Sequence, residues 1–366
     1  MSRTTRRSFI TVCGVASVTT LAGCAETDSS NENEIRVASP YGDVNSTLPV
    51  MHQALKENIE NETDGEISVT LSIGGELGAG TELARLVQQG SVEMALFSLG
   101  NMTPYADAAD LVNLPFLAGK NQQLVNLVTS DEWDDTVHDN LRESDFEPFA
   151  YVCWDPRHLS TGEGASEPKI VPSDMEGVKH RINASEILSQ MWEMIGANPT
   201  PIDWGETSSA LSEGVAETLH VDFMATNSFG FRDILTHVTL TDIIPDVQTY
   251  AMSHSWYSSL SDDLQDAIDN AGEQTFQDML DQLPTSRENS YNQLRDSGVT
   301  FHDIDESERQ QWQDAIGYQR SEWDDWKTDL AGDMETFETL ESAARSDSDY
   351  DVSEPNLEEL ESNYDG

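Results

Sequence analysis

Short stretches of strand pattern alternate with stretches of helical pattern from about residue 35 to about residue 330, and this alternation restricts the possible fold most strongly. Ile67, Val69 and Leu71 alternate as in a half-buried strand, whereas residues 48–59 place their apolar side chains on one helical stripe. Strands are expected at about 35–38, 67–71, 92–98, 148–154, 178–182, 220–225 and 247–256. This order of elements predicts an α/β fold built from strand–helix units.

Helical periodicity fills the intervals between these strands. Helices are expected after Ser46, after Thr81, near 121–143, over 187–195, near 206–213, from Asp262 onward and over 312–330. Pro284 is expected to interrupt the long stretch that begins at Asp262, because proline lacks a backbone donor and clashes with the preceding turn. The stripe that contains Trp312, Trp323 and Leu330 indicates core packing rather than a binding surface.

The chain is strongly acidic. It has 68 Asp and Glu residues against 19 Lys and Arg residues, which gives a formal net charge of -49. The acids are spread over the whole sequence, so their mutual repulsion opposes a compact fold in dilute buffer and nearly vanishes at about 1 M salt. This composition favours adaptation to high salt over an acidic protein of ordinary salt. It disfavours binding to nucleic acid or to an anionic membrane surface, because both need a basic face.

The first residues have the pattern of an export signal. Arg6 and Arg7 precede Ser-Phe, as in the twin-arginine signature, and the apolar run over 9–21 is too short to span a bilayer stably. The sequence LAGC that ends at Cys24 matches a lipobox, which predicts lipid attachment at Cys24 and a place on the outer face of the cell membrane. An uncleaved anchor helix is the alternative, and it leaves the chain on the same side.

Six segments are expected along the chain. Composition and pattern indicate a signal (1–24), a flexible tether (25–34) and an acidic disordered tail (347–366). The family resemblance described below implies a first part of lobe I (35–154), a first part of lobe II (155–246) and lobe-completing strands and long helices (247–346). Of the three cysteines, Cys13 and Cys24 lie in the signal. Cys153 is therefore alone in the mature chain, where its apolar neighbours predict a buried structural thiol.

Four segments together resemble a known family. They are GGELGAGTELARLVQQGSVEMALFS (74–98), NLPFL (113–117), WDPRHLSTG (154–162) with GVKHRINAS (177–185), and GANPTPIDWGETSSALSEGVAE (196–217). In order and spacing they resemble the DctP-type extracellular binding subunits of TRAP transporters. The resemblance implies a two-lobed periplasmic-binding-protein-like fold with a hinge and a long bridging helix. It also implies a small organic acid as ligand, held in the cleft between the lobes, and membrane permease subunits as partners.

Two arginines are the main candidates for holding a carboxylate. Arginine presents a planar fork of donors that stays charged, and Arg157 and Arg181 fall on two neighbouring expected strands of a chain that is poor in basic residues. The resemblance implies that Arg181 matches the carboxylate-binding arginine of the family and that Arg157 matches a second one. An ordinary surface ion pair with one of the many acids is the alternative for both.

The resemblance also implies further ligand-binding residues. These are Trp204, Ser98, Asn101, Tyr41 and Asn45. Packing in the core is the alternative for Trp204. Val221 stands where relatives often have an asparagine that touches the ligand, which puts the substrate class in doubt. For His220 we expect a structural role rather than a functional one.

Motifs of several enzyme classes are missing from the sequence. It contains no G-x-S-x-G elbow, no H-E-x-x-H pair and no P-loop lysine, so we expect no catalytic residues, no metal and no cofactor. Two alternatives to a transport role remain. One is an exported enzyme, such as a hydrolase, on the same scaffold, and the other is a sensory binding module that serves a receptor.

Overall fold

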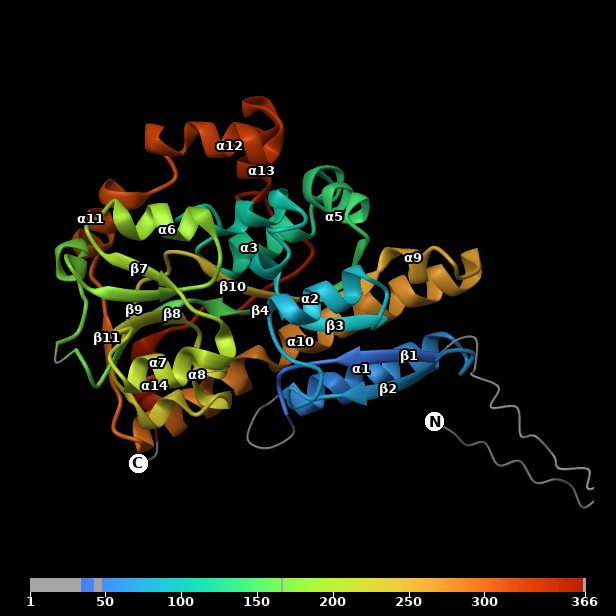
Figure 1. Ribbon diagram of the computed structural model, residues 1–366, viewed down its shortest axis with the longest axis horizontal. Helices are drawn as coiled ribbons and strands as arrows, with labels where there is room; N and C mark the ends of the chain where they lie inside the picture. Colours follow the sequence, from blue (N-terminus) through green and yellow to red (C-terminus); the bar gives the residue numbers. More distant parts are fainter. Residues whose placement is uncertain (1–33, 43–47, 166, 365–366) are drawn as a thin grey trace, which may run out of the picture. The chain divides into compact units, whose positions relative to one another are not determined.

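The computed structural model describes residues 34–42, 48–165 and 167–364, and all of them belong to one compact unit. Eleven strands of this described part form two separate sheets (Figure 1). The strand order is β2-β1-β3-β10-β4 in the first sheet and β11-β9-β5-β8-β6-β7 in the second. The expected α/β fold is confirmed. The expected residues Cys24 and Asn45, the signal and all but the last residue of the tether lie outside the described residues.

The first sheet has a central strand, β3, that is buried except at its last residue. Its members are β1 (Glu34–Ala38), β2 (Ser68–Ser72), β3 (Met94–Ser98), β4 (Phe146–Pro156) and β10 (Pro245–Ser253). β1 pairs in parallel with β2 and β3, whereas β10 runs antiparallel to β3 and β4. The sequence MALFS of β3 is apolar almost throughout and lies in the interior, as expected for a central strand covered on both faces.

The second sheet combines parallel and antiparallel pairs. Its members are β5 (His158–Gly162), β6 (Lys179–Ile182), β7 (Asn198–Pro201), β8 (Thr218–Val221), β9 (Leu235–Leu240) and β11 (Thr300–Asp303). β6 pairs in parallel with β7 and β8, and β5 runs antiparallel to β8 and β9. The sequence patterns do not reveal β7, β9 and β11, because these strands are short and carry polar residues.

Fourteen α-helices accompany the sheets in the described part of the chain. They are α1 (Leu48–Glu62), α2 (Thr81–Gln88), α3 (Asn121–Val128), α4 (Asp131–Trp133), α5 (Asp139–Glu143), α6 (Glu186–Glu193), α7 (Thr207–Ser212), α8 (Phe223–Ser228), α9 (His254–Tyr257), α10 (Asp262–Asp296), α11 (Glu306–Ile316), α12 (Asp324–Ala331), α13 (Met334–Ala343) and α14 (Leu357–Asn363). None of them is long and apolar enough to cross a membrane.

Among the described residues the chain passes between the two sheets three times, once through the long segment with α10 between β10 and β11 and twice through short crossings. Residue 157 links β4 to β5, and residues 241–244 link β9 to β10. The Arg157 N–H donates to the Ile244 carbonyl at 2.9 Å, which ties the two crossings together. Asp155, just before the first crossing, has a φ of 72°, and its carboxylate accepts from the Arg287 guanidinium at 2.8 and 2.6 Å. The first crossing is therefore held to α10.

The long helix α10 is the bridging helix that the resemblance implied. It contacts α1 and β4 of the first sheet and also α8, which follows a strand of the second sheet (Figure 1). The expected break at Pro284 is wrong, because α10 continues through this residue. Leu280 and Leu283 are buried on one side of the proline and Arg287 is buried on the other. This packing offsets the one backbone hydrogen bond that proline removes.

Several predicted boundaries are also wrong. The helix expected over 121–143 is divided into α3, α4, a π-helical turn and α5. The helix expected over 312–330 is two helices, α11 and α12. The strand expected over 220–225 ends at Val221, since the Asp222 carboxylate accepts the backbone N–H groups of Met224 and Ala225 and so begins α8.

The disordered tail expected over 347–366 is wrong for the residues up to 364. Val352, Leu357 and Leu360 are buried, and the last two lie on α14. The Glu354 carboxylate accepts from the backbone N–H groups of Asn121 and Gln122 at the start of α3, both at 3.0 Å. The acidic composition led to a wrong prediction, because three buried apolar side chains are enough to pack this segment against the rest of the fold.

Candidate functional site

A cavity of about 460 Å³ is lined by residues of both sheets. Tyr41 follows β1, Ser98 ends β3, and Arg181 and Val221 come from β6 and β8. Arg157 also lines the cavity, but the strand expected at Arg157 is wrong, because this residue lies between β4 and β5 at the first crossing. This volume lies within the range of about 300–1,000 Å³ that is usual for small-molecule sites. The cavity is named here the interlobe cavity.

Arg181 is a buried cation in the interlobe cavity. Its side chain extends from β6 and the residue is 8% exposed. The guanidinium donates through Nε to the Ile202 carbonyl at 3.0 Å and lies 5.1 Å from the centre of the Trp204 ring. No carboxylate of the described residues is within ion-pair distance of it. Burial, and next the charge of Arg157, lowers the pKa of Arg181 to about 9, so an anion beside this group would relieve an electrostatic cost.

Arg157 is buried in the same cavity but already has an acidic partner. Its Nε lies 3.4 Å from Oδ2 of Asp246, a residue of β10 that is 4% exposed. Its Nη2 donates to Ser98 Oγ at 3.4 Å. The Arg157–Asp246 pair therefore contributes little net charge to the cavity, and Arg181 is the uncompensated cation.

Aromatic side chains form one wall of the cavity. Trp204 packs edge-on against Phe229 and Phe231, with ring centres 5.0 and 5.1 Å apart, and its Nε1 has no hydrogen-bond partner among the described residues. Tyr41 packs edge-on against Trp154 and Phe229. Burial raises the pKa of the Tyr41 hydroxyl well above its usual value, so this group stays protonated and can donate a hydrogen bond.

The remaining expected residues are also in the lining. Asn101 follows β3 and donates to Thr81 Oγ1 at 3.5 Å. Val221 and His220 both line the cavity. Burial lowers the pKa of His220 well below its usual value, so its ring is neutral. Six of the seven expected ligand residues thus surround one cavity, and the seventh, Asn45, lies outside the described residues.

Comparison with known proteins places this geometry in a family. Residues 42–324 match the DctP family, described as bacterial extracellular solute-binding protein, family 7. The chain belongs to this family. The resemblance to DctP-type subunits seen in the sequence is therefore confirmed.

Relatives of the DctP family are distant in sequence but close in fold. A solute-binding protein of Roseobacter denitrificans is 24% identical over 82% of this chain and 90% of its own. The C4-dicarboxylate-binding protein DctP of Vibrio cholerae is 21% identical over 76% of this chain and 82% of its own. A TRAP periplasmic solute-binding protein from Roseobacter denitrificans, solved with bound β-D-glucuronate, is 21% identical, covers 85% of this chain and 99% of that chain, and has a TM-score of 0.77. A TRAP periplasmic solute-binding protein from Shewanella oneidensis, solved with bound succinate, is 18% identical. The match covers 85% of this chain and 99% of that chain, with a TM-score of 0.75. This DctP-family chain accordingly has the two-lobed fold.

Sequence reasoning missed several polar residues of the lining. They are Thr81, Glu82, Asn183, Asp203, Glu206, Asp246 and Gln248. Asn183 lies two residues after Arg181, so strand alternation could have placed it on the same face. The Oδ1 atom of Asn183 is buried and has no hydrogen-bond partner among the described residues. The acidic residues of the lining could not be identified from the sequence, because 68 Asp and Glu residues place a possible ligand-binding acid in almost every segment.

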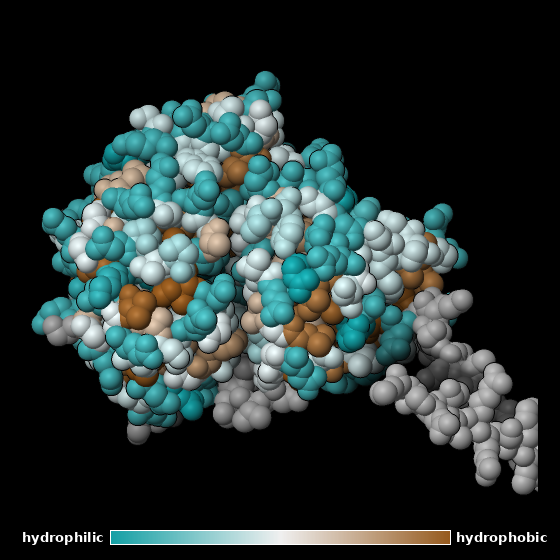
Figure 2. All heavy atoms as spheres, in the orientation of Figure 1, coloured by the Kyte–Doolittle hydropathy of each residue, from teal (hydrophilic) through white to brown (hydrophobic). Residues whose placement is uncertain are grey.

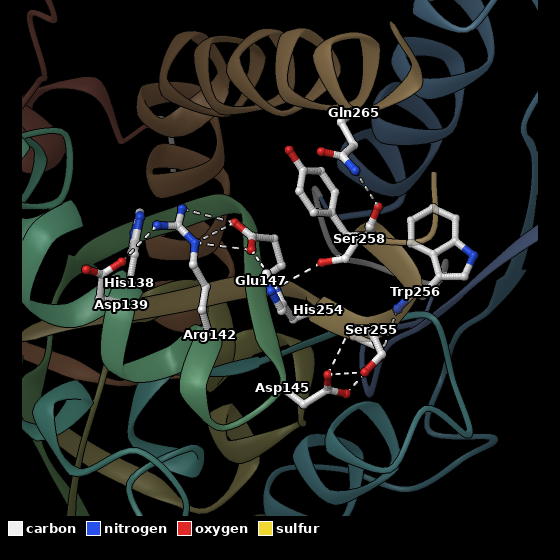
Figure 3. Close-up of polar contacts among 12 residues, drawn as sticks. His138, Asp139, Arg142, Asp145, Glu147, His254, Ser255, Trp256, Ser258 and Gln265 are labelled. Atoms are coloured by element: carbon white, nitrogen blue, oxygen red, sulfur yellow. Dashed lines mark hydrogen bonds and ion pairs between the residues drawn. The ribbon is translucent and has the colours of Figure 1, made fainter. Parts of the chain in front are cut away.

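A second polar cluster in this DctP-family chain resembles a nucleophile–base arrangement (Figure 3). Ser258 Oγ lies 3.2 Å from His254 Nε2, and His254 Nδ1 lies 2.7 Å from Glu147 Oε2. Arg142 also donates to both oxygens of Glu147, at 3.1 to 3.2 Å. None of these residues lines the interlobe cavity. The cluster connects α9, β4 and α5, which fits a structural role.

Proposed function

We propose that this chain captures a small organic acid in the interlobe cavity, outside the cytoplasm, and delivers it to TRAP-type membrane permease subunits. The observation that carries the proposal is Arg181, a buried guanidinium without a carboxylate partner in the described part of the chain. Arginine binds carboxylates with two parallel hydrogen bonds, and a buried site of low dielectric strengthens them. Two-lobed relatives with bound glucuronate and succinate support this assignment.

The charge of the lining favours one carboxylate over two. Arg157 is paired with Asp246, so Arg181 alone awaits an anion. Asn183, Asp203, Glu206 and Gln248 offer acceptors and donors that suit hydroxyl groups. We therefore propose a polyhydroxylated monocarboxylic acid as the ligand class. Relatives from Roseobacter denitrificans and Sulfitobacter, solved with glucuronate and galacturonate, support this choice.

The proposed contacts follow from where the side chains lie. Arg181 binds the carboxylate, Trp204 and Tyr41 cover the ligand, and Arg157, Ser98 and Asn101 orient its polar groups. Asn45 remains a proposed contact from the resemblance alone. The proposed boundaries between the lobes are at 154/155 and 246/247, within three residues of the two short crossings between the sheets.

A binding assay with a matched control tests the proposal. Purified protein in about 1 M NaCl is titrated calorimetrically with glucuronate, galacturonate and succinate, and its melting temperature is measured with each, since a ligand of the native state raises apparent stability. We expect a uronate to bind one-to-one and Arg181→Ala to abolish the response while the fold survives. Arg85→Ala removes an equal charge from an exposed site outside the cavity, and its affinity should equal that of the unchanged protein. Equal binding by Arg181→Ala would rule out this site.

Export and anchoring are proposed from the sequence. Arg6 and Arg7 are proposed to direct twin-arginine export, and Cys24 is proposed to carry a lipid that holds the chain on the outer face of a salt-adapted cell. Cys24→Ala is expected to release the exported protein into the medium. Membrane-bound protein after this substitution would contradict the lipid anchor.

We propose a binding role rather than catalysis, and transport rather than sensing. A hydrolase would have to use the Ser258–His254–Glu147 arrangement, the only one of its kind among the hydrogen bonds of the described residues. A fluorophosphonate probe that labelled Ser258 would favour that alternative. Loss of ligand uptake after deletion of this chain, with chemotactic or transcriptional responses intact, would support transport.

A further inference from the structure

A second cavity, of about 590 Å³, lies away from the interlobe cavity and gathers basic side chains. Lys120, Arg309, Arg320 and Arg345 all line it, so one cavity holds four of the 19 basic residues in the sequence. They come from the start of α3, from α11, from the turn after α11 and from the end of α13. This space is named here the basic cavity. It shares no lining residue with the interlobe cavity.

Backbone carbonyls hold the arginines of the basic cavity in place. Arg309 Nη1 donates to the Thr241 carbonyl at 3.1 Å, and Arg345 Nη1 donates to the Glu341 carbonyl at 2.9 Å. Arg320 Nη1 donates to the Asp314 carbonyl at 2.5 Å. Carbonyl oxygens orient a guanidinium without neutralising it. These carbonyls therefore position the guanidinium groups without supplying a countercharge.

Acidic residues compensate only part of this charge. Arg309 pairs with Asp242 at 3.1 Å, and Arg320 pairs with Glu322 at 2.5 Å. Lys120 and Arg345 have no carboxylate within ion-pair distance among the described residues. The other acid of the lining, Asp314, accepts from the Gln310 amide through Oδ1.

Neutral donors complete the lining. The side chains of Gln123, Gln310, Gln313 and Gln319 surround the cations, and each amide can donate to an oxygen atom. Arg320 Nε is buried and has no hydrogen-bond partner among the described residues. Arg345 also donates to the Tyr318 hydroxyl at 2.9 Å. An oxyanion in this cavity would accept from the free Arg320 Nε and lie beside Lys120 and Arg345, which have no acidic partner in the described part of the chain.

The whole-chain charge makes this gathering unusual. A formal charge of -49 provides ample carboxylates to scatter among the cations, yet four separate segments bring like charges to one place. Lys120 and Arg345 are exposed, so solvent and salt screen part of their repulsion, and an anion in the cavity would offset the remainder. We propose that the basic cavity binds a small oxyanion, with Lys120 and Arg345 as its uncompensated ligands. This inference does not depend on the proposed function of the interlobe cavity.

The position of the basic cavity connects it to the second strand crossing. Asp242 of this crossing lines the cavity, and a Cβ atom on Gly119 would lie 2.2 Å from the Asp242 carbonyl oxygen. The Phe116 N–H also donates to the Ile243 carbonyl at 2.7 Å. The loop before α3 is therefore pressed against the crossing, and only glycine fits at residue 119. An anion held by Lys120 and Arg309 would lie against this contact.

Equilibrium titration with defined probes tests the proposal. Citrate and inorganic sulfate are titrated separately at constant ionic strength, with the unchanged protein and with the double variant Lys120→Gln/Arg345→Gln. We expect one of the two probes to bind and the double variant to bind it about tenfold more weakly, because two charge-assisted contacts are lost. Sulfate binding indicates a compact oxyanion, and citrate binding alone indicates a polycarboxylate.

Two controls distinguish binding in the basic cavity from a general effect of net charge and from binding in the interlobe cavity. Arg85→Gln/Lys179→Gln removes two charges from exposed positions that line neither cavity, and its affinity should match that of the unchanged protein. With sulfate as the probe, Arg181→Ala should also leave the affinity unchanged, whereas citrate bound in the interlobe cavity would be lost in this variant. No binding of either probe, equal weakening in both double variants, or loss of binding only in Arg181→Ala would each overturn the proposal.

Discussion

At the scale of single residues, two buried arginines in one cavity differ in whether a carboxylate lies beside them. Arg157 has Asp246 at 3.4 Å, whereas Arg181 has a carbonyl and an indole ring. The sequence allowed both arginines to be predicted, because basic residues are scarce and these two match a family pattern. It did not single out Asp246, since one acid among 68 carries no local signal and its partner is 89 positions away. The net charge of the site therefore became visible only in the fold.

Asp246→Asn should shift the preference of the cavity toward dicarboxylates. The amide keeps the shape of the side chain but frees Arg157 from its acidic partner, so a second carboxylate gains a cation. We expect the ratio of succinate to glucuronate affinity to rise by about fivefold to tenfold, the effect of one new charge-assisted contact. Calorimetric titration of both ligands measures this ratio.

Asp203→Asn is the matched control. Asp203 also lines the cavity. The substitution removes one negative charge, as Asp246→Asn does, but leaves the Arg157–Asp246 pair intact. The ratio should change much less in this variant. An unchanged ratio in Asp246→Asn would show that the Arg157–Asp246 pair does not limit the ligand charge.

At the scale of elements, the C-terminal segment shows where composition misleads. Residues 347–364 are rich in acids, yet Leu357 and Leu360 fall three positions apart on one face of α14 and are buried. Much of the pattern of strands and helices up to residue 256 was predictable because it repeats, although several boundaries were wrong and the short strands β7 and β9 were missed. A single short helix offers no such repetition. Its place depends on Arg287, which donates to the Ser353 and Glu354 carbonyls at 2.9 and 3.0 Å.

Leu360→Ala should destabilise the whole protein. Removing a buried leucine side chain costs about 2 kcal/mol or more through lost burial and the cavity left behind, and α14 is expected to loosen as a result. Urea unfolding followed by circular dichroism measures the free energy of unfolding. Glu361→Ala changes the adjacent exposed position and should alter stability by less than about 0.5 kcal/mol. Equal stability of the two variants would mean that α14 is not seated on the fold.

At the scale of the whole molecule, the formal charge is -49, and the face seen in Figure 2 is largely covered by hydrophilic residues, with some apolar ones visible between them. Val215 is the only exposed large hydrophobic residue among those described. Such a surface resists association through apolar contacts but repels itself in dilute solution. The two-lobed arrangement was predictable from the family resemblance. The basic cavity was not, because its four cations are distant in sequence and meet only after α11, α13 and α3 have packed.

Stability should therefore depend strongly on salt. Between about 0.1 M and about 1 M NaCl the screening length falls from about 10 Å to about 3 Å, so repulsion among surface carboxylates is largely removed. We expect the melting temperature to rise by roughly 10 °C over this range, or about 3 kcal/mol at 2–4 °C per kcal/mol. Sucrose at the same molarity is the control, because it does not screen charge. A melting temperature that stayed constant in NaCl would contradict salt adaptation.

Cys153 lies on β4 opposite Val247 of β10, two residues before Asp155 and the first crossing, and it is fully buried. Burial raises the pKa of its thiol, so in the folded protein it should be inert toward thiol-reactive dyes. Any chain that starts after residue 24 contains this sulfur and no other cysteine. The protein thus carries one buried, unreactive thiol on the edge strand β4 of the first sheet, where it faces β10. The rate at which a thiol-reactive dye labels Cys153 will report how often β4 separates from β10.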